Sequence, residues 1–519
     1  MLRRLAPLFL TSFLWACGAG SAATPAKAPE TAPPAPSAST PESTAEKPTS
    51  APPIAAPPPS EECTPYAATQ PGACNAGNLS ELLAGALAES GVARDRKLAC
   101  LEKSSEAPAG WVRALRAELA PRGCADVVVG DAANGGGAAR DLSDTLVALS
   151  AGAKLYRTVR QPPLPRPPFD KPAFLKHFKE VLIPWISEQA RSVDQLSKVG
   201  PRLSGYARGL VALEAGLADL RFVGVARSVE LPTEMKSDPE VRETYLVALE
   251  QALEPRVTRG RDAALVGLGE LSRLGVTRDA RVTEARALLS ELFAGRRLDA
   301  LDRLALPALP PLRADSAALE VAAKLPAFYA VKLDASAPMS DAKVLRARLE
   351  QGVPPALWLD AKPPATPELA ALAQRGLFQL GQLYFWAEPF TRAAAIDAPK
   401  GNDDAALIGA LAKVLARGPR HAAAMMLGPT TLPAELRDTA PIDALAKGKG
   451  NVAGMAELDA AYLRALSPPA NDPSFWKDQA ARYTRAQQKL TDPSAKALAG
   501  ELAKAAQATE RELRKSAQP

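Results

Sequence analysis

Residues 238–255 have the sequence DPEVRETYLVALEQALEP, and this stretch indicates the fold class of the chain. Its apolar residues recur every four positions, at Val241, Tyr245, Leu249 and Leu253. That spacing places them on one face of an α-helix. Asp238 is a favourable N-cap and Pro239 suits the first helical position, whereas Pro255 is expected to end the helix. The stretch therefore predicts an amphipathic helix bounded by two prolines.

The same helical pattern extends over most of the chain. A second helix is predicted after Asp279, with apolar residues at Val282, Ala285, Leu289 and Leu292 and its end at Gly295. Similar start signatures recur at Thr366-Pro367, Asp472-Pro473 and Asp492-Pro493. Alternating β-branched runs joined by Asn-Gly or Asp-Gly turns, which are typical of strands, are nearly absent. We therefore expect an all-α body over 139–519, an irregular α-solenoid or helical-hairpin superhelix, with a closed helical bundle as the alternative.

One segment of this body resembles a known helical repeat. Leu380-Gly381-Gln-Leu-Tyr384, with Ala393 nine residues after Tyr384, is similar to part of a tetratricopeptide unit. The resemblance implies a pair of antiparallel helices. Asp397 and Lys400 depart from that pattern, and no second copy lies 34 residues away. Pro-rich breaks at 161–168, 306–311 and 353–355 are expected to end helices and separate sub-blocks, without being recognition motifs.

The first twenty residues, MLRRLAPLFLTSFLWACGAG, predict export. Arg3 and Arg4 precede a twelve-residue apolar run that is too short to cross a bilayer, as in a signal peptide. Leu14-Trp15-Ala16-Cys17 resembles the lipobox of bacterial lipoproteins, although Trp15 replaces the usual small residue. The resemblance implies removal of residues 1–16, acylation of Cys17 and, with Gly18 following, anchoring in the outer membrane. The alternative is an ordinary secretory signal in which Cys17 has no special role.

Residues 17–60 are expected to form a disordered linker after the lipidated cysteine. Twelve prolines lie between Pro25 and Pro59, among Ala, Ser, Thr and Glu, and no apolar periodicity is present. Such a linker would hold the following domain away from the membrane. No later stretch approaches 18 consecutive apolar residues, so no transmembrane helix is expected.

Four cysteines within 61–138 predict a small disulfide-bonded helical module. They are Cys63, Cys74, Cys100 and Cys124, and the 395 residues after Cys124 contain none. An even number of clustered cysteines in an exported chain favours two disulfides, for which three connectivities exist. We favour Cys63 with Cys74, which would close a short loop containing Pro and Gly, and Cys100 with Cys124, which would clamp two consecutive helices. Asn78 is expected to cap the first helix of the module, and the glycines of 130–137 to form a hinge after it.

Composition excludes several classes of function. The chain has only two histidines, His177 and His421, and neither lies in a metal-binding or catalytic-triad motif. The net charge is +6, or +4 without Arg3 and Arg4, which is too weak a bias to predict nucleic-acid binding. The basic residues Arg256, Arg259 and Arg261 are expected in a solvated loop. No phosphate-loop motif, and no catalytic Glu-Ser of lytic transglycosylases in a Gly-rich context, is present. We assign no catalytic, metal-ligating or cofactor-binding residue.

The aromatic residues between 378 and 390 are the candidate partner-binding residues. Tyr384, Trp386 and Phe390 could line a groove for a peptide or helix, or they could fill a core made mostly of alanine. The sequence therefore favours a membrane-anchored envelope lipoprotein whose helical body binds another envelope protein. The alternative is an envelope glycan hydrolase with an all-α catalytic domain, which would need a cleft holding a pair of carboxylates.

Overall fold

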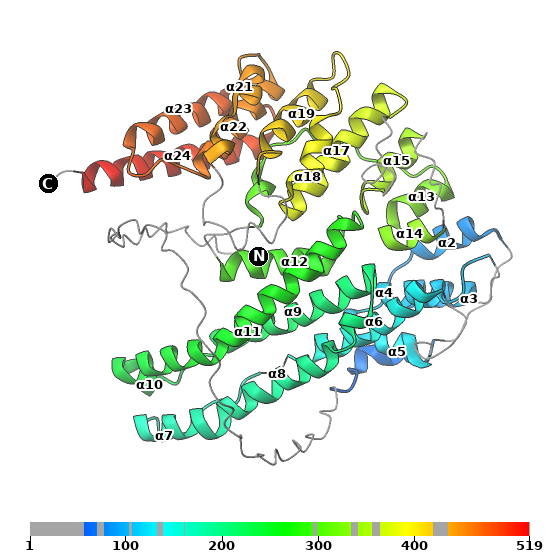
Figure 1. The fold of residues 1–519 in the computed structure, drawn as a ribbon, viewed down its shortest axis with the longest axis vertical. Helices are drawn as coiled ribbons and strands as arrows, with labels where there is room; N and C mark the ends of the chain where they lie inside the picture. Colours follow the sequence, from blue (N-terminus) through cyan, green and yellow to red (C-terminus); the bar gives the residue numbers. More distant parts are fainter. Residues whose placement is uncertain are drawn as a thin grey trace, which may run out of the picture. The chain divides into compact units, whose positions relative to one another are not determined.

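The computed structural model describes residues 57–69, 77–102, 106–131, 139–159, 161–293, 298–333, 341–354, 364–418 and 434–517. These belong to one compact unit, Pro53–Pro519, whereas a second unit, Met1–Pro52, lies outside the described residues. Within the described ranges all regular structure is helical, apart from one isolated bridge between Val276 and Gly352 (Figure 1). The predicted all-α fold is confirmed.

The N-terminal part consists mainly of short helices. They are α1 (Thr64–Ala67), α2 (Leu79–Leu87), α3 (Gly91–Leu101), α4 (Trp111–Leu119), α5 (Ala125–Val129) and the longer α6 (Arg140–Arg157). As predicted, Asn78 caps the first turn of α2, where its side chain accepts a hydrogen bond from the backbone N–H of Glu81 at 2.9 Å.

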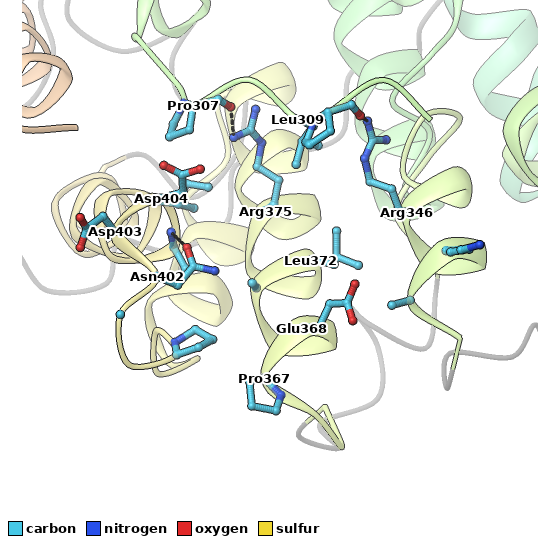
Figure 2. A pocket seen from close by; sticks show the side chains of 18 of the residues that line it. Pro307, Leu309, Arg346, Pro367, Glu368, Leu372, Arg375, Asn402, Asp403 and Asp404 are labelled. Atoms are coloured by element: carbon cyan, nitrogen blue, oxygen red, sulfur yellow. Dashed lines mark hydrogen bonds between the residues drawn. The ribbon is translucent and has the colours of Figure 1, made fainter. Parts of the chain in front are cut away.

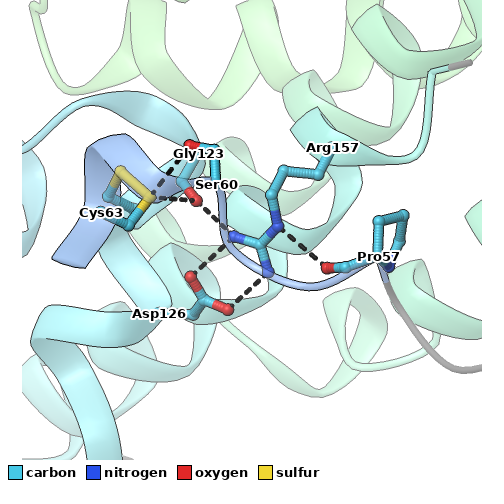
Figure 3. The surroundings of a disulfide bond; sticks show 7 residues. Pro57, Ser60, Cys63, Gly123, Asp126 and Arg157 are labelled. Atoms are coloured by element: carbon cyan, nitrogen blue, oxygen red, sulfur yellow. Dashed lines mark hydrogen bonds and ion pairs between the residues drawn. A yellow bond between two sulfur atoms is a disulfide. The ribbon is translucent and has the colours of Figure 1, made fainter. Parts of the chain in front are cut away.

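The disulfide in this part joins Cys63 to Cys124, so the predicted pairing of neighbouring cysteines is wrong. The chain passes from the short 3₁₀ helix η1 (Glu61–Cys63) through α2 to α4 and comes back to η1 at a second 3₁₀ helix, η2 (Arg122–Cys124). Figure 3 shows the same junction fastened by Arg157 of α6, which binds both carboxylate oxygens of Asp126 at 2.7 and 2.8 Å and the carbonyl of Pro57 at 3.0 Å. Cys100 is also disulfide-bonded, and Cys74 lies outside the described residues.

This N-terminal part shares its core with the rest of the body, so the boundary predicted at 138/139 does not separate two cores. One continuous cluster of buried apolar side chains runs from Tyr66 to Ala506. The indole Nε1 of Trp111 in α4 donates to the carbonyl of Tyr329 at 3.1 Å, and the Tyr329 hydroxyl donates back to the carbonyl of Ala114 at 3.0 Å. The predicted hinge at 130–137 lies mostly outside the described residues; Gly130, which is described, ends α5.

The centre of the fold is a pair of long antiparallel helices, α9 (Gly205–Arg227) and α11 (Pro239–Arg273). They approach so closely that a Cβ built on Gly216 would lie 2.5 Å from the backbone nitrogen of Ala264. A Cβ on Gly267 would similarly lie 2.7 Å from the backbone nitrogen of Leu213. Only glycine allows this separation. The neighbouring helices of this region are α7 (Lys171–His177), η4 (Phe178–Leu182), α8 (Ile183–Ser197), η5 (Gly200–Arg202), α10 (Thr233–Ser237) and α12 (Ala280–Leu292).

Pro255 does not end α11, contrary to prediction, and the helix continues for 18 residues beyond it. The continuation carries Arg256 and Arg259 to the buried carboxylate of Asp219 in α9, with N···O distances of 2.5 to 2.8 Å. These arginines therefore lie inside a helix and not in the solvated loop that the sequence suggested. The ion pairs and the packing beyond Pro255 outweigh the missing backbone hydrogen bond.

The C-terminal half is a succession of helical hairpins. Its elements are η6 (Ala300–Arg303), α13 (Ala317–Lys324), α14 (Ala327–Leu333), α15 (Ala342–Arg348), α17 (Pro367–Tyr384), α18 (Ala387–Ala394), α19 (Asp403–Leu415), η7 (Ala434–Arg437), α21 (Ala440–Ala446), α22 (Asn451–Ala465), α23 (Pro473–Lys489) and α24 (Pro493–Ser516). The side chains of Thr366, Asp472 and Asp492 cap α17, α23 and α24, as their Pro-containing start signatures predicted.

We expect Gly216→Ala to destabilise the protein by about 3 kcal/mol, because the added methyl group meets backbone atoms that cannot move aside. Gly224→Ala in α9 and Gly269→Ala in α11 are matched controls, since nothing lies within 4 Å of a Cβ at either position. Both controls should be neutral or stabilise by up to about 1 kcal/mol. Urea denaturation followed by circular dichroism measures the difference. Equal midpoints for Gly216→Ala and Gly224→Ala would contradict the proposed close contact.

Replacing Cys63 and Cys124 together by alanine should lower the free energy of unfolding by about 2–4 kcal/mol, because the bond closes a 61-residue separation in the unfolded chain. Non-reducing peptide mapping of the wild-type protein tests the pairing directly. A cross-linked peptide joining Cys63 to Cys124 is expected, and a peptide joining Cys63 to Cys74 would refute the pairing.

Candidate functional site

An open groove of about 850 Å³ lies in the C-terminal half (Figure 2). Its floor is the first half of α17, from Pro367 to Arg375, and one side is formed by α15. The opposite side is the loop 399–402 with the first turn of α19. The remaining wall is the Pro-rich segment 307–312, which has no regular secondary structure.

Side-chain caps fix where the helices around the groove begin. Asp341 caps α15, Thr366 caps α17 and Asn402 caps α19, each through a side-chain oxygen that accepts backbone N–H groups of the first turn. The Pro-rich segment was expected only to separate sub-blocks. In the structure it is also a wall of the groove, held by two arginines that donate to its carbonyls.

Arg375 is the most unusual residue of the groove. It is only 9% exposed, and its Nη1 donates to the carbonyl of Pro307 at 2.8 Å. Its Nε is buried and has no hydrogen-bond partner. Burial lowers the pKa of the Arg375 guanidinium and Arg346 lowers it further, whereas Asp404 acts in the opposite direction. The side chain is thus a buried cation whose hydrogen-bonding capacity is only partly used.

The other charged residues of the groove are Lys343 and Arg346 on the α15 side, Glu368 on α17, and Lys400, Asp403 and Asp404 on the α19 side. Arg346 of α15 donates to the carbonyl of Pro310 at 3.3 Å and pairs with Glu350. Figure 2 shows Arg346 on one side of Arg375 and Asp403 and Asp404 on the other, with Glu368 near the start of α17. Apolar side chains lie between them, namely Leu309, Leu312, Leu372 and Ile408.

The three aromatic residues predicted to bind a partner lie in the core. Tyr384 is 2% exposed and its hydroxyl donates to the carbonyl of Val276 at 2.8 Å. Phe390 packs on Phe378, with ring centroids 5.2 Å apart, and against the Gly381 backbone. Trp386 is 9% exposed. The alternative of aromatic side chains filling a core rich in alanine is therefore correct, and these residues present no surface to a partner.

A second cavity, of about 510 Å³, contains the carboxylate pair that a hydrolase would need. The guanidinium of Arg281 lies between the two carboxylates: its Nη2 forms an ion pair with Glu118 of α4 and another with Asp279. Asp279 additionally caps α12, accepting the backbone N–H of Arg281 at 2.7 Å. Burial raises the pKa of Glu118, whereas Arg281 and the backbone donors overcome burial and lower the pKa of Asp279. Since the guanidinium occupies the space between the carboxylates, the arrangement joins α4 to α12 and leaves no room there for a glycosidic bond.

The remaining titratable candidates have structural roles or lie outside the described residues. His177 lies in α7, where burial lowers its pKa, and His421 is not described. In the described ranges no cluster of three or more His, Cys, Asp or Glu side chains could hold a metal ion. None of the described helices is both long and apolar enough to cross a membrane.

Asp459 of α22 is fully buried near a third cavity of about 690 Å³. Its Oδ1 accepts the backbone N–H of Ala305 at 2.7 Å, whereas its Oδ2 has no partner. Burial raises the pKa of Asp459 well above its usual range, and this single hydrogen bond only partly opposes the shift. The carboxyl group fastens the segment after η6 to α22.

Sequence reasoning did not identify Arg375 or the groove. The groove combines segments between residues 307 and 408, and no local motif connects them. Comparison of the chain with known protein families, curated proteins and solved structures finds no match.

Asp459→Asn should make the protein more stable at pH 7 and remove one source of its pH dependence. The pKa of Asp459 is raised in the folded state. Its stabilising contribution to the free energy of unfolding is therefore fully present below about pH 4, where the carboxyl of the unfolded chain is also protonated. This contribution is lost as the pH rises toward the folded pKa. Each unit of raised pKa corresponds to about 1.4 kcal/mol. Thermal unfolding of both proteins between pH 4 and 7 measures the difference. A variant that is less stable than the wild type at pH 7 would contradict a protonated Asp459.

Proposed function

We propose that this chain is a bacterial envelope lipoprotein whose helical body binds a segment of another envelope protein in the groove between α15, α17 and α19. The observation that carries the proposal is the groove itself, open to solvent and lined by apolar, basic and acidic side chains. Protein-binding surfaces combine apolar area with a few charged groups in this way.

The N-terminal sequence supports the location. Acyl chains on Cys17 would anchor the chain at the outer membrane, since two or more chains give stable attachment. The Pro-rich residues up to Ser60 would serve as a tether that keeps the groove near the membrane and raises its effective concentration for membrane-bound partners. No nucleic acid, metal or cofactor enters this proposal.

A binding role is favoured over the alternative glycan hydrolase. The carboxylates in the second cavity are engaged by Arg281 and by the first turn of α12. A general acid or base must reach the proton that it transfers, and these carboxylates already have strong partners. The groove around Arg375, by contrast, contains a buried donor without an acceptor.

A photo-crosslinking amino acid placed at Leu372 should capture a defined envelope protein in intact cells. Leu372 is half-buried and lines the groove, whereas Lys504 in α24 is exposed and distant in sequence, which makes it the control position. Crosslinking at Leu372 should persist when Cys17 is replaced by alanine, and the variant chain should leave the membrane fraction. The captured species and the fractionation are read by mass spectrometry and immunoblotting.

Three outcomes would each overturn part of the proposal. Equal capture of the same species from Leu372 and Lys504 would show that the groove is not the contact surface. Recovery of glycan fragments without any protein would favour the hydrolase class. Retention of the Cys17→Ala chain in the membrane would refute the proposed anchor.

A further inference from the structure

We infer that Arg375 binds a carboxylate of an extended peptide segment lying in the groove. This inference rests on the proposed function and specifies the chemistry of the partner. It begins from a comparison of the buried arginines of this chain. Five other arginines are buried, and each forms an ion pair with at least one Asp or Glu: Arg116, Arg256, Arg281, Arg286 and Arg482. Within the described residues, Arg375 is the one buried arginine that forms no ion pair with a carboxylate; Asp404 lies near enough to act on its charge but does not contact it.

A buried guanidinium without a counter-ion is costly to the folded chain. Removing the charge from water is compensated only by a nearby opposite charge and by hydrogen bonds for its N–H groups. Arg375 has one hydrogen bond to a protein atom, from Nη1 to the carbonyl of Pro307, and its Nε has none. A carboxylate arriving through the groove would supply the directly paired opposite charge that the Arg375 guanidinium lacks.

The shape of the guanidinium favours a carboxylate. Its N–H groups form a planar fork that matches two oxygens of one carboxylate. Figure 2 shows Arg375 between Arg346, which attracts an anion, and Asp404 on the α19 side, which repels one. Asp404 forms no ion pair with Arg375 in the structure, so the ligand carboxylate would enter on the side of Arg346.

The rest of the groove favours an extended peptide as the bearer of this carboxylate. Pro307, Pro310 and Pro311 have no N–H group, so half of the residues in the wall 307–312 cannot donate a backbone hydrogen bond to a ligand. Side-chain contacts therefore gain weight, and Leu309 and Leu372 offer apolar surface for them. Glu368 and Asp403 lie on the rim, where they suit a basic group elsewhere on the same peptide.

The test uses the purified full chain in detergent and an immobilised random heptapeptide library. Each sequence is present once with a free C-terminal carboxylate and once as the C-terminal amide. The wild-type protein should be retained about 10- to 100-fold more strongly by the free-carboxylate members, as expected for a charge-assisted hydrogen-bonded pair. If internal Asp or Glu residues carry the preference instead, the carboxylate comes from a side chain, and the inference about Arg375 holds equally.

Variants assign the preference to Arg375. Arg375→Met keeps the length of the side chain and should abolish the discrimination, whereas Arg375→Lys, which keeps the charge but not the fork, should reduce it. Arg313→Met is the matched control because Arg313 is exposed, lies beside the same Pro-rich segment and does not line the groove. It should leave the discrimination unchanged. Thermal unfolding of each variant shows whether it folds, and the comparison of acid with amide in the wild type requires no variant.

The outcomes separate this inference from the proposed function. Peptide retention without any preference for carboxylates, or a preference that survives in folded Arg375→Met, overturns the role of Arg375. If Leu372 captures a protein in cells but no peptide is retained, the carboxylate inference fails and the groove remains a binding surface. Absence of both results overturns the inference and the proposed function together.

Discussion

The close crossing of α9 and α11 is the contact on which the other helices of this protein depend. At Gly216 and Gly267 the two backbones come together without a side chain between them. The helices α6, α8 and α12 all pack on α9, so the position of α9 places the elements around it. The ion pairs of Asp219 with Arg256 and Arg259 lie at the same crossing. Sliding one helix along the other would leave this buried carboxylate without a partner, so charge and shape select the same register.

The N-terminal part is attached to this centre through polar contacts that are distant in sequence. Arg122 binds Glu214 of α9 and Glu284 of α12, and Arg281 binds Glu118 of α4. The buried disulfide from Cys63 to Cys124 joins the beginning and the end of the α2–α4 segment in the same region. Ion pairs and a covalent bond thus hold the N-terminal part together and connect it to α9 and α12.

Local features of the fold were predictable because they depend on neighbouring residues. The starts of α2, α12, α17, α23 and α24 were identified from their N-caps, and the helical period identified the fold class. Features that depend on distant residues were not predictable. By itself, Pro255 predicts the end of a helix. The helix continues because Asp219 of α9 lies opposite Arg256 and Arg259, and the local sequence does not show this. The pairing of Cys63 with Cys124 requires the path of α2 to α4, and the burial of Tyr384 and Phe390 requires the positions of their neighbours.

The candidate site could not be predicted from the sequence for the same reason. No motif marks it; what distinguishes Arg375 is that its partners differ from those of the other buried arginines. In the sequence Arg375 is one charged residue on an amphipathic helix, where a solvated position would be the ordinary expectation. Its meaning appears only when its burial and its partners are compared with those of the other buried arginines. Each of those arginines forms an ion pair with an Asp or Glu of the same chain, whereas Arg375 does not. Natural proteins depart from their own packing rules mostly at functional positions. An unpaired buried cation beside an open groove is such a departure, and a ligand carboxylate is the simplest group that would complete it.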